Sequence, residues 1–171
     1  MKGELPLLPA AQKLQAELME PMPSRTFEGT LEEEAHLLSM SKKIFLMAGA
    51  QAVQKYQLKL EREQEVLSHL ADIMISVYAM ESALLRTQKL IARAGEDKAE
   101  LPIAMTRAFI HEEFGKIEAW AKEVLSYMEQ GDLLRTQLSI LKKLTKRSAV
   151  NTLSLKRQIA AKVIQAERYV L

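Results

Sequence analysis

Few side chains in this sequence could carry out chemistry, and the best candidates are histidines and glutamates at helical spacing. Glu33-x-x-His36 has the spacing of one metal-binding pair, and the other candidate ligands are Glu65, His69, His111 and Glu112. Di-iron bundles use two such Glu-x-x-His pairs and two further glutamates on facing helices. Here His69 follows Glu65 by four residues and Glu112 comes after His111, so the second pair is missing. A ferritin-like metal-binding bundle stays open as an alternative to surface or half-buried polar histidines.

The remaining acids indicate structural roles. Glu112 and Glu113 are adjacent, so on a helix their side chains diverge by about 100° and do not share a proton. Asp72 and Glu81 interrupt an apolar segment, where a buried carboxylate without a partner would be costly. We expect a hydrogen bond or an arginine to hold each of them, and the candidate arginines are Arg86 and Arg107.

Composition excludes several other classes of function. The 171-residue chain has no cysteine, which excludes disulfides, thiolate catalysis and cysteine-ligated metal centres. Its hydrophobic fraction of 48% and charged fraction of 27% are typical of a globular protein, and its apolar runs are too short to span a membrane. From Arg135 onward nine Lys or Arg stand against one acid, a formal +8, which suits an anionic partner or solvated helix faces. Trp120 and Tyr127 are predicted to pack against a core, so we expect no nucleic-acid partner.

A long helix is predicted to organise the chain between residues 63 and 91. Apolar residues recur there at spacings of three, four and seven: Val66, Leu70, Ile73, Val77, Met80, Leu84 and Ile91. A second set widens this stripe on one side: Leu67, Ala71, Met74, Tyr78 and Leu85. The pattern predicts a helix with more than one buried face, as inside a bundle.

Further helices are predicted on both sides of this segment. Thr30 and Glu33 match a capping box, so a helix should begin at Leu31 and continue to about residue 60. A third helix should cover about 101–130, after Gly95 has ended the organising helix in a left-handed conformation. Two shorter helices should follow caps at Asp132 and at Asn151. The last one is predicted to bury a stripe of Leu155, Ile159, Val163 and Ala166.

The domain boundary is predicted near residue 30. The first 29 residues hold four of the five prolines, so no continuous helix can cross them. We predict a linker with one short amphipathic helix over residues 10–20, where Leu14 and Leu18, with Leu7 and Leu8 before them, form a small apolar face. Residues 30–171 are predicted to fold as one all-α domain, an antiparallel up-and-down bundle of four to five main helices.

The segment LADIMISVYAMESALLR resembles a helix in the C-terminal domain of the very-long-chain type of acyl-CoA dehydrogenase. In that family a Leu-Ala-Asp start is followed by Tyr-Ala-Met and then Leu-x-Arg, and the family-like structural positions here are Asp72, Tyr78, Met80 and Arg86. The segments LPLLPAAQKL, KYQLKLEREQEVL and IAAKVIQAERY are similar to bacterial members. The resemblance therefore covers nearly the whole chain, and it implies the helical bundle of the family's C-terminal domain.

The resemblance also implies a function for the longer protein. Acyl-CoA dehydrogenases are flavoproteins of fatty acid β-oxidation, oxidoreductases that use FAD and a glutamate base. This chain has no counterpart of that base or of the flavin site, so no residue is assigned to catalysis, cofactor binding or a metal, and FAD is implied only for the full-length protein. The domain would pack on the catalytic domain of the same polypeptide and help set a homodimer.

The resemblance also has an implication for localisation, and one alternative function remains. The family implies a cytoplasmic protein with peripheral membrane contact near the start of this domain. The N-terminal segment here has more proline and fewer basic residues than a strong membrane anchor. A free-standing helical protein-interaction module would explain the lack of chemistry and the basic C-terminus equally well.

Overall fold

The structure is a computed structural model that describes residues 9–10, 13–14, 17–18 and 26–168. All regular structure within these ranges is helical. The α-helices with complete bounds are α2 (Glu32–Tyr56), α3 (Gln64–Ala94), α4 (Glu100–Met128), α5 (Gly131–Leu144) and α6 (Thr152–Ala166). Two short 3-10 helices, η1 (Gln57–Arg62) and η2 (Asp97–Ala99), connect α2 to α3 and α3 to α4. The all-α fold class is confirmed.

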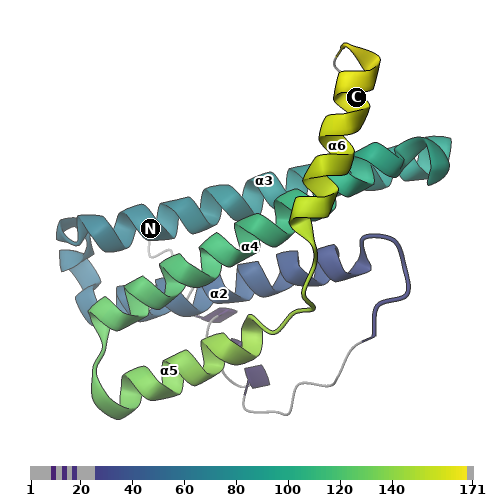
Figure 1. Ribbon diagram of the computed structural model, residues 1–171. Coiled ribbons are helices and arrows are strands. Elements are labelled where there is room, and N and C mark those ends of the chain that lie inside the picture. Colours follow the sequence, from purple (N-terminus) through teal and green to yellow (C-terminus); the bar gives the residue numbers. More distant parts are fainter. Residues whose placement is uncertain (1–8, 11–12, 15–16, 19–25, 169–171) are drawn as a thin grey trace, which may run out of the picture.

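The first four of these helices run up and down beside one another (Figure 1). α2, α3 and α4 pack against each other, and α5 covers α4 and α2 on a further side. Each helix from α3 to α5 runs opposite to its predecessor, as an antiparallel bundle requires. α6 leaves the bundle, contacts α4 and projects beyond it.

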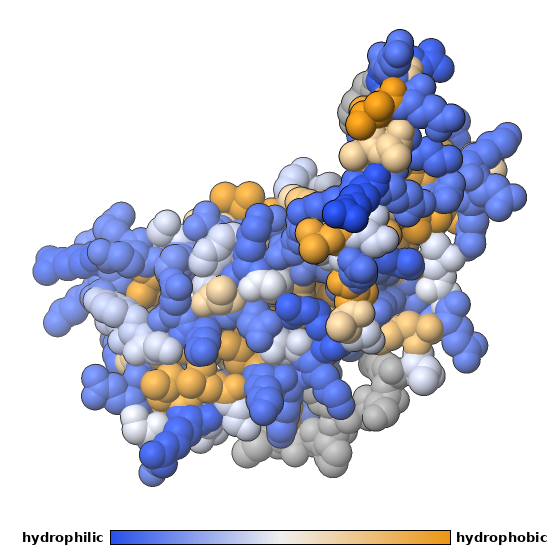
Figure 2. Space-filling view, in the orientation of Figure 1, coloured by the Kyte–Doolittle hydropathy of each residue, from blue (hydrophilic) through white to orange (hydrophobic). Residues whose placement is uncertain are grey.

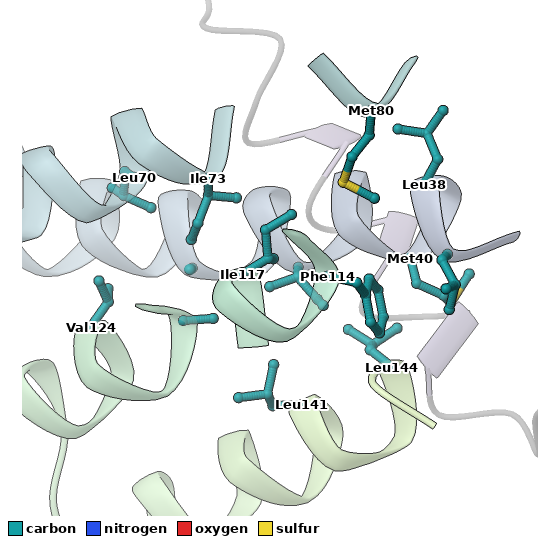
Figure 3. Close-up of a cluster of buried hydrophobic side chains, with 14 of the residues drawn as sticks. Leu38, Met40, Leu70, Ile73, Met80, Phe114, Ile117, Val124, Leu141 and Leu144 are labelled. Atoms are coloured by element: carbon teal, nitrogen blue, oxygen red, sulfur yellow. The ribbon is translucent and has the colours of Figure 1, made fainter. Parts of the chain in front are cut away.

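The core lies where α2, α3 and α4 meet, with α5 closing one side (Figure 3). Phe114 and Ile117 of α4 and Met80 of α3 are completely buried there. Leu14 and Leu18 belong to the same cluster, with 5% and 6% of their surfaces exposed. Leu7, Leu8 and most of the predicted linker lie outside the described residues.

The start of α2 differs from the predicted capping box. The residue before the helix is Leu31, which is completely buried and has a φ of 63°. Its apolar side chain cannot cap the helix, and Glu33 instead accepts a hydrogen bond from the Ser148 backbone N–H at 3.1 Å. The carboxylate that reaches back is that of Glu32, which accepts from the N–H groups of Glu28 and Gly29 at 3.1 and 3.0 Å. The capping-box prediction is wrong because burial of Leu31 sets where the helix begins.

The ends of the other helices agree with the predictions only in part. Asn151 caps α6 as expected, and its side-chain oxygen accepts from the Ser154 N–H at 2.9 Å. Asp132 is not a cap, because it lies in the first turn of α5 and pairs with Arg135 at 3.0 Å. Gly95 ends α3 with a positive φ of 84°, a conformation that favours glycine as expected, but its ψ of 164° lies far from the left-handed helical value.

Only one face of α3 is buried, so the prediction of a second buried face is wrong. The buried residues are Val66, Leu70, Ile73, Ser76, Met80, Leu84 and Thr87. On the second face Met74, Tyr78 and Leu85 are 55%, 74% and 58% exposed, and the nearby Ile75 is 63% exposed. Among the α-helices with complete bounds, α3 packs mainly against α2 and α4, and it also contacts the two 3-10 helices at its ends. α3 is therefore an edge helix of the described bundle.

α6 has no buried residue, so its predicted buried stripe is also wrong. Val163 is 40% exposed, and Leu155 and Ile159 are half-buried. Polar contacts attach the helix to α4, because Lys156 pairs with Glu112 there. The apolar positions of α6 therefore remain accessible.

Candidate functional site

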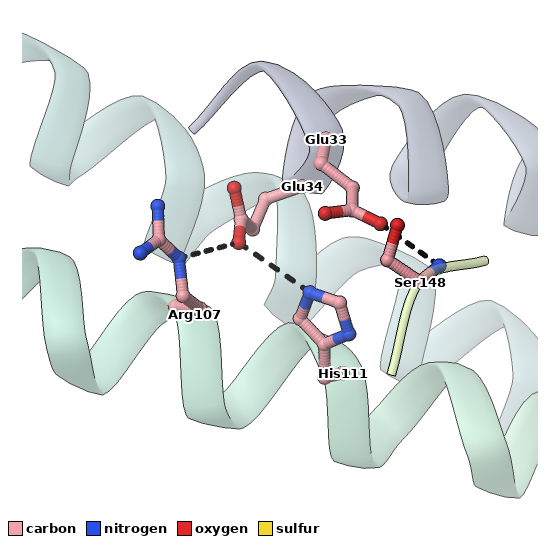
Figure 4. Close-up of polar contacts among 5 residues, drawn as sticks. All are labelled: Glu33, Glu34, Arg107, His111 and Ser148. Atoms are coloured by element: carbon pink, nitrogen blue, oxygen red, sulfur yellow. Dashed lines mark hydrogen bonds and ion pairs between the residues drawn. The ribbon is translucent and has the colours of Figure 1, made fainter. Parts of the chain in front are cut away.

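The most enclosed charged side chain in the described residues is the carboxylate of Glu34 (Figure 4). Glu34 lies in the first turn of α2, while Arg107 and His111 lie one turn apart on α4. Arg107 Nε donates to Glu34 Oε1 at 2.9 Å, and His111 Nε2 lies 3.4 Å from the same oxygen. The side chains of Glu34 and His111 are 2% and 4% exposed, whereas that of Arg107 is 38% exposed.

The charge of Glu34 is kept by its neighbours. Burial alone would raise the pKa of this carboxyl, because apolar surroundings solvate a charge poorly. His111, the backbone N–H of Glu34 and the Arg107 guanidinium outweigh that effect and hold the pKa of Glu34 below its usual range. An ionised carboxylate that is 2% exposed cannot reach a substrate. Its geometry instead ties the first turn of α2 to α4.

The structure does not bring the predicted metal ligands together. Among the described residues, no group of three or more His, Cys, Asp or Glu side chains could hold a metal ion. Glu33 binds the Ser148 backbone, the ring of His36 lies 5.2 Å from that of Phe27, and His69 pairs with Glu123 at 3.0 Å. The remaining candidates are also apart: His111 faces Glu34, Glu112 pairs with Lys156, and Glu65 is exposed.

Neither of the two acids that interrupt the apolar pattern of α3 pairs with a predicted arginine among the described residues. Glu81 pairs with Lys42 of α2 at 2.6 Å. Asp72 is half-buried, and no hydrogen bond or ion pair joins it to any residue that the structure describes. Arg107 binds Glu34 instead. The expected hydrogen bond is therefore confirmed for Glu81, with Lys42 as the donor instead of an arginine, whereas Asp72 has neither partner among the described residues.

The other singled-out residues divide between core and surface. Met80 is completely buried, while Tyr78 and Arg86 are exposed. Trp120 packs partly buried against the core as predicted, but Tyr127 is 62% exposed and its hydroxyl donates to Glu63 at 3.0 Å. Glu113 accepts from the Ser76 hydroxyl at 2.7 Å and from Lys116 at 2.6 Å; it does not share a proton with Glu112.

A groove lies between α3 and α4 near their connection. Its volume is about 560 Å³, and it is open to solvent along one side. α3 contributes Ala83, Arg86, Thr87, Lys89, Leu90 and Arg93, and α4 contributes Pro102, Met105, Thr106 and Phe109. The lining thus combines apolar side chains with three cations.

Two exposed apolar faces complete the candidate surfaces. The first is the α3 face, which we define by Met74, Ile75, Tyr78 and Leu85. The second is on α6, where Leu153 and Ile164 are 72% and 74% exposed. Figure 2 shows hydrophobic patches on the projecting α6 arm among hydrophilic residues. Exposed apolar faces of this kind mark surfaces that bind another protein or domain. Binding, rather than covalent chemistry, is what this arrangement supports.

Sequence reasoning missed the Glu34 cluster, although a signal for it was present. The α2 stripe of Leu38, Ser41, Ile44 and Ala48 recurs every three or four residues, and its backward extension reaches Glu34. A carboxylate on a buried stripe requires a cation from a facing helix. The signal was obscured because Glu32, Glu33 and Glu34 together look like an acidic first turn.

Comparison with known proteins gives one consistent family. Residues 40–143 match the family model described as acyl-CoA dehydrogenase, C-terminal domain. A probable acyl-CoA dehydrogenase of Bacillus subtilis (strain 168) is 49% identical over 169 residues, which cover 99% of this chain and 28% of that protein. The crystal structure of an acyl-CoA dehydrogenase complexed with FAD from Bacillus anthracis matches 100% of this chain with a TM-score of 0.96 and 48% identity.

The matches cover nearly all of this chain but only part of each relative. The chain covers 29% of the Bacillus anthracis chain, so it spans less than a third of the length of either relative.

Among the helices that the structure describes, none combines the length and the apolar character needed to cross a membrane.

Proposed function

Since the chain belongs to the acyl-CoA dehydrogenase family and matches its C-terminal domain, we propose that it is the non-catalytic C-terminal domain of a longer, FAD-dependent acyl-CoA dehydrogenase of fatty acid β-oxidation. The observation that carries the proposal is the similarity along 99% of this chain to only 28% of a probable acyl-CoA dehydrogenase. The relative from Bacillus anthracis is complexed with FAD, which supports FAD as the cofactor of the longer protein.

A first experiment tests whether FAD binding and acyl-CoA oxidation require the longer polypeptide. The 171-residue chain purified alone should be colourless and should not oxidise an acyl-CoA when FAD and an electron acceptor are supplied. A longer polypeptide that contains it should bind FAD and carry out the oxidation. Stoichiometric FAD retained by the short chain through gel filtration would contradict the proposal, and an upstream coding sequence without a flavin-binding domain would favour the free-standing interaction module.

The α3 face is the proposed docking surface for the catalytic domain. It is exposed here although its residues are those of an interface centre, because Met and Tyr are enriched at the centres of protein interfaces. Tyr78 is one of the family-like positions, and at 74% exposure it has no packing role within the described residues. Docking of another domain against α3 would bury this face as fully as the opposite one.

Substitutions on the α3 face separate docking from folding. Leu85→Glu should leave the melting temperature of the 171-residue chain nearly unchanged, since Leu85 is 58% exposed there. In the longer polypeptide it should raise hydrogen exchange along α3 and loosen the domain. The matched control is Leu133→Glu on α5, where Leu133 is 51% exposed on a different helix. Equal effects of both changes in the longer polypeptide would refute the proposal that the catalytic domain docks on the α3 face.

The assembly is proposed to be a homodimer in which α6 contacts the second subunit. α6 projects from the bundle, and polar contacts attach it to α4, including a 3.1 Å hydrogen bond from Gln158 to Glu100. Ile164→Glu should therefore shift the longer protein from dimer to monomer in sedimentation. We further propose a cytoplasmic protein with peripheral membrane contact near its residues 1–29, which vesicle co-sedimentation of the longer protein tests.

A further inference from the structure

The groove between α3 and α4 is unlike the two exposed apolar faces because it combines a concave shape with concentrated charge. Leu90, Pro102, Met105 and Phe109 form half-buried apolar walls. A volume of about 560 Å³ falls in the range of small-molecule pockets, which are roughly 300–1,000 Å³. It is too small for a helix, whose diameter with side chains is about 10 Å or more.

Two buried threonines at the base of the groove bind each other. Thr87 and Thr106 each expose 5% of their surface, and their hydroxyl oxygens lie 2.7 Å apart in a mutual hydrogen bond. Both threonines are therefore nearly buried and offer little polar surface to a ligand. Apolar walls over such a floor favour an alkyl chain.

The rim of the groove is cationic. Arg86, Lys89 and Arg93 are spaced three and four residues apart, so they follow one edge of α3 over about 10 Å. All three are exposed, and no carboxylate of the described residues pairs with them. Two acids on the helices that form the groove are already engaged: Glu81 of α3 pairs with Lys42, and Glu100 of α4 accepts a hydrogen bond from Gln158. Three unpaired cations beside an apolar groove attract an anionic head group.

We propose that this groove binds one molecule of a single-chain anionic amphiphile, such as a long-chain carboxylate. The alkyl chain lies between Leu90 and the Met105 and Phe109 side chains, and the anionic head binds at Arg86 and Arg93. The concave shape selects a monomer over a membrane, because the flat surface of a bilayer cannot place its chains below the rim.

The test uses palmitate as the probe, held below its micelle concentration and measured by displacement of a fluorescent fatty acid from the 171-residue chain. We expect saturable binding of one molecule per chain. Hexadecanol, which has the same chain length and no charge, should bind at least tenfold more weakly. Arg86→Gln/Arg93→Gln should also weaken palmitate binding at least tenfold.

Two further variants complete the design. The matched control Lys142→Gln/Arg157→Gln removes two exposed cations from α5 and α6 and should change the dissociation constant less than twofold. Met105→Glu places a carboxylate on the groove wall and should abolish binding, with an unchanged far-UV spectrum and melting curve as the check on folding.

Several outcomes would overturn the proposal. Equal binding of palmitate and hexadecanol, or equal loss in the rim variant and its control, would show that the groove does not recognise an anion. Binding to phosphatidylglycerol vesicles without binding of monomeric palmitate would assign the surface to a membrane. Loss of palmitate binding in the longer polypeptide would show that the groove is a seat for another domain.

Discussion

Replacement of Glu34 by Gln tests whether the buried carboxylate stabilises the bundle. The amide keeps the shape of the side chain but loses the charge that holds Arg107 at 2.9 Å. Hydrogen bonds to charged groups contribute about 1.5–3 kcal/mol, and leaving a buried charge without its partner costs about 3–5 kcal/mol. Because Arg107 is 38% exposed, water can solvate it in the variant, so the lower figure applies. We expect a loss of about 2 kcal/mol at pH 7.

The pH dependence of this loss has a defined sign. The pKa of Glu34 is lowered from its ordinary value of 4.5, so the folded state binds the Glu34 proton less readily than the unfolded state. The contribution of the carboxylate is therefore fully present above pH 4.5 and disappears as the pH falls through the folded-state pKa. The difference in unfolding free energy between the natural protein and Glu34→Gln should thus shrink as the pH falls below 4.5 toward pH 3.

Urea unfolding at each pH is the assay, with thermal melting as support. About 2 kcal/mol corresponds to a fall of about 4–8 °C in the melting temperature of a domain of this size. Glu33→Gln is the matched control, since the neighbouring carboxylate is only half-buried and accepts one backbone hydrogen bond at 3.1 Å. Its cost should stay below about 1 kcal/mol. Equal costs for the two variants, or a Glu34→Gln cost that is unchanged at pH 3, would refute the reasoning.

Three further changes have outcomes fixed by local structure. Asp72→Ala should cost within about 0.5 kcal/mol, because Asp72 has no partner among the described residues, and a loss near 2 kcal/mol in urea unfolding would reveal a hydrogen bond. Gly115→Ala should stabilise the chain by about 0.5–1 kcal/mol, since the new methyl would meet only Arg147 Nη2 at 3.6 Å, whereas Gly95→Ala should cost about 1–3 kcal/mol at a φ of 84°. Leu14→Ala should cost about 2–5 kcal/mol, because Leu14 is 5% exposed, and a cost below 0.5 kcal/mol would show that the N-terminal segment is docked only weakly.

The sequence predicts the helices and their core residues well because both depend on a local period. Phe114, Ile117 and Met80 recur at helical spacing and are completely buried. The Asn151 cap is equally local, since one side chain binds an N–H three residues later. The Thr30 cap fails for a non-local reason: the burial of Leu31 against the rest of the bundle decides the start of α2.

The predicted site residues depend on contacts that no local pattern contains. Glu34 meets Arg107 across 73 positions of sequence, and Glu81 meets Lys42 across 39. Charge and spacing identify which side chains need partners, but only the packing of α2 against α3 and α4 selects the partner. Arg107 was therefore recognised as a pairing residue and assigned to the wrong carboxylates.

The second apolar stripe of α3 shows why a predicted buried face can be exposed. Periodicity records that Met74, Tyr78 and Leu85 share a face, and it cannot distinguish a core from a surface that another domain covers. Charge makes a further distinction on the same helix. The groove is rimmed by Arg86, Lys89 and Arg93, which pair with no carboxylate of the described residues, whereas the α3 face is an uncharged stripe rich in Met and Tyr, which are enriched at interface centres. α3 thus presents two neighbouring surfaces of different character, an exposed apolar face for which we propose a domain as partner and a concave groove for which we propose a small anionic amphiphile.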